Sequence, residues 1–142
     1  MTDKTMRLRI LTPFGTKVDE NVNMVVMRCL TGDWGVLPGH APSSAVLKYG
    51  ALRMMNGDYE RMIAVYGGIA SVRDNVITVL TSEADWPEEI DLARARAEYD
   101  QAEQRLRERT DDIEMQFDTL RIRRALVQIE ISAYSLTKQD VD

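Results

Sequence analysis

The spacing of apolar residues changes once along this chain of 142 residues, and the change lies between Ser82 and Pro87. Before it, apolar and polar residues alternate in short runs, as in half-buried β-strands. After it, apolar residues recur every three or four positions, as on one face of a helix. All 8 glycines precede Ser82. We therefore predict a mainly β, then α chain, with a β-sandwich domain over residues 1–85, an antiparallel two-helix hairpin over 86–135 and a tail over 136–142.

The first part carries several strand and turn signals. Apolar residues alternate with arginines over Met6–Ile10, which predicts a strand with one buried face. Asn56-Gly57 and Asp74-Asn75 separate further strand-like runs and tolerate the positive φ angles of tight hairpin turns. Gly67-Gly68 lacks the spacing of a phosphate loop and predicts a bend or bulge between strands. Many short strands at close spacing are typical of a sandwich or barrel.

The second part predicts two helices joined by a short polar break. Asp91 is suited to cap the first helix, whose apolar face is rich in alanine and therefore buries little area. Asp111 is suited to begin the second helix, which we expect to end close to Ala133. The apolar face predicted for the second helix consists of Ile113, Phe117, Leu120, Val127 and Ile131. A pair that packs so little apolar surface is weakly stable by itself, so the hairpin is a candidate mobile element.

The composition disfavours several function classes. A net charge of -5 and an isoelectric point near 5.0 argue against sequence-independent nucleic-acid binding. No run of about 20 apolar residues could span a bilayer, and no secretory signal is visible, so we expect a cytoplasmic protein. Cys29 and His40 are the single residues of their kinds, which argues against a metal site. Cys29 lies in an apolar run and is expected to be a buried thiol.

Two features of the sequence allow more than one interpretation. Trp34, among glycines in a loop, either covers the core or anchors an interface. Three arginines of the second helix, Arg121, Arg123 and Arg124, form either a solvated face or a surface for an acidic partner or a phosphate.

The segment 32–42, GDWGVLPGHAP, closely resembles the signature loop of the epsilon subunit of F-type ATP synthases. Further segments match the family in the same order, at residues 47–53, 66–72, 73–76 and 90–95. The resemblance implies a non-catalytic rotor subunit, peripheral to the cytoplasmic side of a bacterial membrane. Its sandwich would bind the gamma subunit and rest on the c ring, which couples ion flow to rotation. Its hairpin would extend toward the catalytic alpha and beta subunits and restrain ATP hydrolysis.

The resemblance also assigns individual residues. Asp33 and Trp34 correspond to the c-ring contact, although Trp34 stands where a smaller apolar residue or phenylalanine is usual. His40 and Ser43 correspond to the gamma-facing surface. No cofactor is required, but ATP is a regulatory ligand of some bacterial members, whose I-D-x-x-R-A pattern matches Ile90, Asp91, Arg94 and Ala95, with Arg124 on the second helix.

The nucleotide assignment has a structural alternative. Gln101 and Gln128 stand where such binders carry further arginines. Asp91 could merely cap the helix, and Arg94 could pair with Glu98 four residues later.

Two other functions compete with the rotor subunit. One is a free-standing β-sandwich module that binds proteins and carries a helical tail. The other is an enzyme that uses His40 as a general base near Ser43 and Ser44, for which the sequence offers no orienting third residue.

Overall fold

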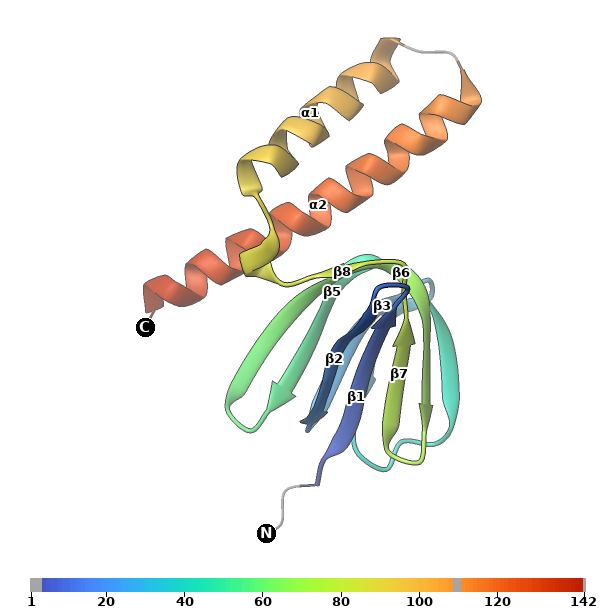
Figure 1. Cartoon of the computed structure of the whole chain (residues 1–142), viewed down its shortest axis with the longest axis vertical. Coiled ribbons are helices and arrows are strands. Elements are labelled where there is room, and N and C mark those ends of the chain that lie inside the picture. The colour runs from blue at the N-terminus through green and yellow to red at the C-terminus, as the bar shows by residue number, and fades with distance from the viewer. Residues whose placement is uncertain (1–3, 109–110, 142) are drawn as a thin grey trace. The chain divides into compact units, whose positions relative to one another are not determined.

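A computed structural model describes residues 4–108 and 111–141, without the side chains of 135–141 (Figure 1). The chain divides into two compact units, Met1–Asp85 and Trp86–Asp142. The first unit contains the strands and the second contains the helices.

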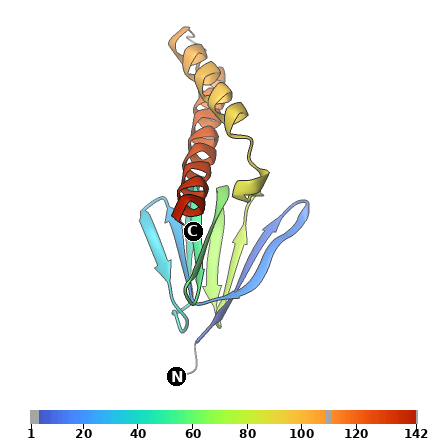
Figure 2. The same ribbon diagram turned by 90° about the vertical axis from the view of Figure 1, so that its left-hand side faces the viewer.

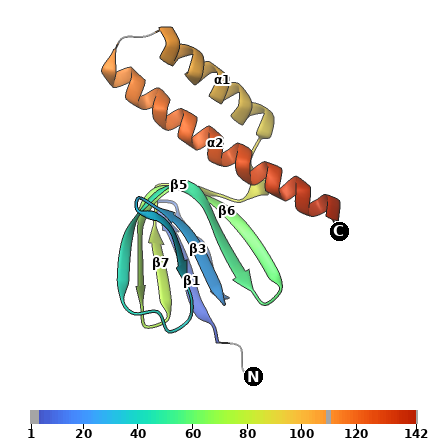
Figure 3. The same cartoon turned by 180° about the vertical axis from the view of Figure 1, so that it is seen from behind.

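Within its described residues the first unit forms one 8-stranded sheet. The strands are β1 (Met6–Thr12), β2 (Gly15–Val22), β3 (Met24–Cys29), β4 (Gly32–Val36), β5 (Ser43–Asn56), β6 (Tyr59–Arg73), β7 (Val76–Leu80) and β8 (Ala84–Asp85). Their order is β2-β1-β7-β6-β5-β3-β4, and β8 pairs with β6. The sheet curls into two layers, with β1 and β2 in front in Figure 1 and β3 in front in Figure 3. The predicted sandwich fold is confirmed.

The core of the sandwich comes from the inward positions of alternating strands. In β1, Met6, Leu8 and Ile10 are buried while the arginines between them face solvent, as predicted. The largest fully buried side chains of this unit are Leu8, Ile10, Met27, Leu52, Met54, Ile63 and Ile77. Burial of such side chains contributes about 1.5–3 kcal/mol each relative to exposure.

Both predicted hairpins are confirmed, although the first turn consists of Gly57 and Asp58, because Asn56 ends β5 and pairs with Tyr59. Asp74 and Asn75 adopt φ angles of 51° and 61°, and Gly57 has a φ of 66°. Positive φ at one or both central residues gives a two-residue turn the twist that antiparallel strands need.

Two local predictions for the sheet are wrong. Gly67 and Gly68 lie inside β6 rather than between strands, since φ angles of 77° and 119° let glycine bend the strand without ending its pairing. The segment after Thr31 is not a loop, because Gly32–Val36 forms β4 and pairs with β3. Trp34 therefore lies on the edge strand of the sheet.

The second unit contains a short 3₁₀ helix, η1 (Pro87–Glu89), and two helices, α1 (Leu92–Glu108) and α2 (Asp112–Val141). The helices pack against each other as an antiparallel hairpin, as Figures 1 and 2 show. Asp91 Oδ1 accepts a hydrogen bond from the Arg94 backbone N–H at 3.1 Å, which confirms the predicted cap of α1. Asp111 Oδ1 accepts one from the Ile113 N–H at 3.0 Å.

The helix α2 differs from its prediction in length and in its buried face. It continues to Val141, past the expected end near Ala133 and through residues expected to be a tail, because no glycine or proline interrupts it. The predicted apolar face is only partly buried: Val127 and Ile131 are buried, but Ile113, Phe117 and Leu120 are 67%, 56% and 40% exposed.

Other buried residues of the hairpin lie outside the predicted apolar face. Ala95 and Ala102 are buried on α1, and Ala125 and Asp118 are buried on α2. Small side chains let two helices approach closely but bury little apolar area.

Candidate functional site

A row of apolar side chains crosses the outer face of the sandwich. In the sheet register Val46 of β5 pairs with Ile69 of β6, Ile69 pairs with Leu80 of β7, and Leu80 pairs with Leu11 of β1. Directly opposed residues point to the same face of a sheet. Val46, Ile69 and Leu80 are 51%, 54% and 53% exposed, and Leu11 is half-buried. We call these four residues the outer row.

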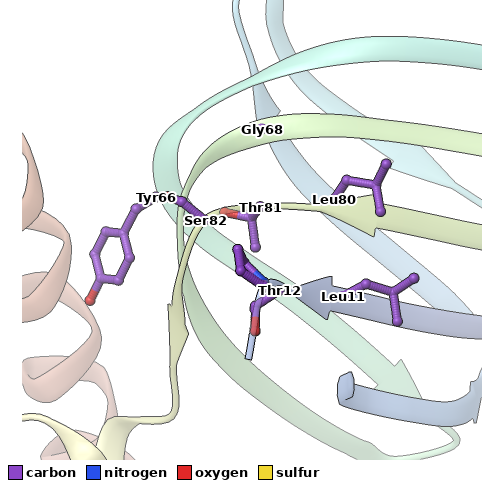
Figure 4. A pocket seen from close by; sticks show the side chains of 8 residues that line it. Leu11, Thr12, Tyr66, Gly68, Leu80, Thr81 and Ser82 are labelled. Carbon is purple, nitrogen blue, oxygen red and sulfur yellow. The ribbon is translucent and has the colours of Figure 1, made fainter. Parts of the chain in front are cut away.

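A cavity of about 510 Å³ lies at the end of the outer row, where Leu11 and Leu80 project from neighbouring strands (Figure 4). Its lining consists of Leu11, Thr12, Pro13, Tyr66, Gly68, Leu80, Thr81 and Ser82. Phe14, which follows Pro13, is 92% exposed. The outer row and this cavity therefore form a contiguous, mainly apolar surface, which is typical of a protein contact site.

The pattern of the amino-acid sequence alone does not identify the outer row. The sequence does contain the apolar residues, which stand at outward positions of alternating strands. The outward side of a given position follows only from the register, which the sequence does not supply.

Hydrogen bonds fix the orientations of His40, in the loop between β4 and β5, and of Ser43, the first residue of β5. His40 Nδ1 lies 2.7 Å from the Ala41 carbonyl oxygen, which can only accept, so Nδ1–H donates. The Ser43 hydroxyl donates to the same oxygen at 3.1 Å. The Gly39 N–H donates to Asn75 Oδ1 at 2.7 Å, which ties the loop to the β6–β7 turn.

These bonds give the loop a structural role. His40 and Ser43 both bind the Ala41 carbonyl rather than each other, so they do not form a nucleophile and its base. Ser43 pairs with buried Val72, whereas Ser44 is exposed. Alternation along β5 places Ser44 on the same face as Val46.

Asp33 and Trp34 point to opposite faces of β4. Trp34 pairs with buried Met27, so its ring lies on the core side at the sheet edge. The ring is half-buried and contacts His40 edge to face, with 5.7 Å between ring centroids. Asp33, one position earlier, is exposed. The structure therefore favours a core-covering role for the Trp34 ring and leaves Asp33 on the surface.

The residues matched to the nucleotide motif lie at the start of α1 and along α2. Asp91 caps α1, and Ala95 is buried. Arg94 Nε forms an exposed ion pair with Glu98 Oε1 at 3.1 Å, as the structural alternative predicts. Ile90 and Arg124 are half-buried. The structure thus brings together Asp91, the Arg94 backbone and Glu98, and Arg94 would have to leave Glu98 to reach a phosphate.

A charged cluster that the sequence analysis missed joins the two helices. Asp118 of α2 is 1% exposed, and its Oδ1 accepts hydrogen bonds from Arg105 Nε of α1 at 3.0 Å and from an Arg121 terminal nitrogen at 2.7 Å. Burial alone raises the pKa of Asp118, but the hydrogen bonds from Arg121 and Arg105 outweigh it and lower the pKa below its usual value. The ionised carboxylate is therefore the favoured form.

The described residues contain no group of three histidine, cysteine or acidic side chains placed to hold a metal ion. Cys29 is buried as predicted, and burial together with the nearby charge of Asp33 raises the pKa of its thiol. Among the described helices, none combines the length and apolarity needed to cross a membrane.

Comparison with known proteins gives matches along nearly the whole chain. Residues 5–87 match the family described as ATP synthase, Delta/Epsilon chain, beta-sandwich domain, and residues 88–133 match the long alpha-helix domain of the same chain. The chain is 38% identical to the ATP synthase epsilon chain of Bacillus velezensis over 129 residues, which cover 91% of this chain and 98% of that one. It is 42% identical to the epsilon chain of Alkalihalophilus pseudofirmus over 108 residues, with coverage of 76% and 81%.

A solved structure shares the fold. The chain superposes on a chain of the Euglena gracilis mitochondrial ATP synthase, solved as OSCP/F1/c-ring, with a TM-score of 0.78 and 22% identity, covering 92% of this chain and 81% of that chain.

Proposed function

The chain belongs to the delta/epsilon family of ATP synthase subunits, and from this membership we propose that it is a non-catalytic central-stalk subunit that couples ion translocation to ATP synthesis. The observation that carries the proposal is the match to both family domains, in order, over residues 5–133. The bonding of His40 and Ser43 to one carbonyl supports the absence of catalysis by this pair.

The outer row is the surface that we assign to the gamma subunit. It offers three half-exposed aliphatic side chains in line across β5, β6 and β7, next to an apolar cavity. The loop that carries His40 leads through Ser43 into Ser44 and Val46 on this face, so it borders the same contact. Burial of such aliphatic side chains in an interface favours association by about 25 cal/mol per Å².

Substitution of the outer row tests this contact. Ile69→Asp places a charge in the centre of the row, and we expect it to weaken gamma binding at least tenfold. Tyr59→Asp is the matched control, because Tyr59 is exposed at the opposite end of β6. Pull-down with purified gamma subunit, with thermal unfolding to verify folding, provides the measurement. Equal binding by both variants would refute the assignment.

We assign the c-ring contact to the edge of the sandwich that includes β4. Asp33 is exposed there, and Trp34 supports it from the core side. Disulfide cross-linking tests this contact and the peripheral position on the cytoplasmic side of the membrane. An Asp33→Cys variant should form a disulfide with c-ring loops that carry a cysteine.

The hairpin would restrain ATP hydrolysis by the alpha and beta subunits. The fully buried residues of α1 are Ala95 and Ala102, so separating this helix from α2 exposes little fully buried apolar surface of α1. The exposed Ile113, Phe117 and Leu120 supply an apolar face for a new partner. Complexes assembled without residues 87–142 should keep coupled synthesis and hydrolyse ATP faster than the intact complex.

ATP would act as a regulatory ligand of the closed hairpin, held by Ile90, Asp91, Arg94, Ala95 and Arg124. Arg94 and Arg124 come from different helices, so a ligand that binds both favours closure. A charge-assisted hydrogen bond to phosphate contributes about 1.5–3 kcal/mol.

Because Arg94 pairs with Glu98, one substitution should weaken ATP binding and another should strengthen it. Arg94→Ala should abolish the heat of ATP binding in calorimetry, whereas Glu98→Gln frees the Arg94 guanidinium and should strengthen binding. Absence of binding heat from the wild-type chain at millimolar ATP would contradict the nucleotide site. Asp91 and Arg94 would then serve only the capped start of α1.

A free-standing protein-binding module is the second candidate function. The observation that favours it is the exposed outer row. Native copurification separates the two functions. Isolation of this chain without gamma, alpha and beta subunits would refute the stalk assignment and favour the module.

A further inference from the structure

The helical hairpin contains one buried charge among the residues that the structure describes, the carboxylate of Asp118. Its side chain is 2% exposed, while those of its partners Arg105 and Arg121 are 35% and 56% exposed. The two arginines therefore reach water and the carboxylate does not. The Asp118 carboxylate therefore depends on the two arginines for compensation of its charge, whereas the arginines can also be solvated by water.

The two arginines relate differently to Asp118. Arg121 lies three residues later on α2, so it stays beside Asp118 whatever α1 does. Arg105 lies on α1 and approaches Asp118 only when the helices are packed together. The Arg105–Asp118 pair is thus the charged contact that forms when the hairpin closes.

Closing the hairpin removes the Asp118 carboxylate from water. A buried carboxylate that lacks sufficient partners is strongly unfavourable, and loss of one partner from a buried ion pair destabilises far more than replacement of both partners by apolar residues. On α1 the fully buried residues are Ala95 and Ala102, so this helix brings little fully buried apolar area to offset an uncompensated charge.

We propose that Arg105 and Asp118 form an electrostatic clasp that makes closure of the hairpin conditional on their pairing. With Arg105 in place the closed hairpin is favoured. Without it, α1 leaves α2 and Asp118 returns to water with Arg121. The lowered pKa of Asp118 agrees with a carboxylate whose partners outweigh its burial. The clasp is a property of the hairpin itself and does not depend on whether the hairpin regulates ATP hydrolysis.

A distance measurement on the full-length chain tests the clasp. Spin labels on cysteines that replace exposed Gln101 of α1 and exposed Leu126 of α2, in a Cys29→Ala background, report whether the helices are together. Arg105→Met keeps the aliphatic stem and removes the charge. We expect it to increase the population with long distances at least fivefold.

Two further variants separate the clasp from a general loss of structure. Arg107→Met is the matched control, since Arg107 is 76% exposed and pairs with Glu103 on its own helix, so its distance distribution should equal that of the wild type. The double variant Arg105→Met/Asp118→Leu removes both charges and should restore the closed population.

Circular dichroism verifies that the helices remain in each variant. A closed Arg105→Met hairpin would overturn the proposal. So would a double variant as open as the single one, since removal of the Asp118 charge would then fail to restore closure and the uncompensated carboxylate would not be the cause of opening.

Discussion

The hydroxyl of Tyr66 donates a hydrogen bond to Asp85 Oδ2 at 2.8 Å and so ties β6 to the last strand of the sandwich. Pairing of Val65 with Ala84 and of Ala64 with Asp85 completes this attachment. The sandwich therefore includes the residues just before the helical unit. A stable sandwich fragment must contain β8.

Truncation after Trp86 should leave a cooperatively folding sandwich, because it retains β8 and the Tyr66–Asp85 bond. Truncation after Ser82 removes both, and a hydrogen bond to a charged group contributes about 1.5–3 kcal/mol. We expect the shorter fragment to be less stable by about 2 kcal/mol or more. Urea titration followed by intrinsic fluorescence measures the difference. Equal stability would show that β8 is dispensable.

Gly68→Ala should destabilise the sandwich severely. Gly68 has a φ of 119°, and an added Cβ would overlap the carbonyl oxygen of Leu80 on the neighbouring strand. Strain at such a backbone conformation costs on the order of 1–3 kcal/mol before the overlap is counted. Gly35→Ala is the control, since its Cβ would meet only the Met24 methyl at 3.6 Å. Denaturant titration should show a loss at least twice as large for Gly68→Ala.

The Cys29 thiol should resist alkylation in the native chain. Burial and the charge of Asp33 raise its pKa, so the reactive thiolate is scarcer than in an exposed cysteine. Reaction of the thiol with a disulfide reagent at pH 8, followed by absorbance, should be slow in the native chain and rapid in denaturant. Rapid stoichiometric labelling of the native chain would contradict the burial of β3.

Acid should weaken both units through different carboxylates. The hydrogen bond from Arg7 lowers the pKa of Asp19 in the sandwich, and Arg121 and Arg105 outweigh burial to lower that of Asp118 in the hairpin. A depressed folded-state pKa gives stability that is present above the unfolded value, about 3.9, and is lost as the pH falls through the folded value. Stability should therefore decline below about pH 4.

Matched variants separate the two contributions. Asp19→Asn should reduce the pH dependence of sandwich unfolding and leave the helix distances unchanged. Asp118→Asn should flatten the pH dependence of the helix distances alone. If the pH dependence of a variant equals that of the wild type, the substituted carboxylate does not cause the loss of stability in acid.

Local patterns sufficed for much of the fold. Alternation located β1, and the dipeptides Asn56-Gly57 and Asp74-Asn75 located two hairpins, because each depends on neighbouring residues only. The strand β4 was missed because the glycines around Trp34 resemble a loop, and its pairing with β3 decides the conformation.

The candidate site was harder to predict for the same reason. The outer row exists only through the register of four strands, and Asp118 lies beside the apolar face of α2 rather than on it. Three-residue and four-residue spacing identified which residues share a face of α2, but did not identify which face meets α1. That choice depends on the packing of the two helices, which buries Asp118 and pairs it with Arg105 of α1.

The parallel pairing of β1 with β7 has a consequence for synthesis of the chain. Leu8 is opposite Ile77 in this pairing, so the first strand made waits for one of the last strands of its unit. Contacts between residues so distant in sequence form late and slow the folding of β proteins. Until β7 leaves the ribosome, one edge of β1 is unpaired and its apolar side chains lack their final neighbours. The nascent sandwich is therefore most prone to aggregation just before its translation is complete.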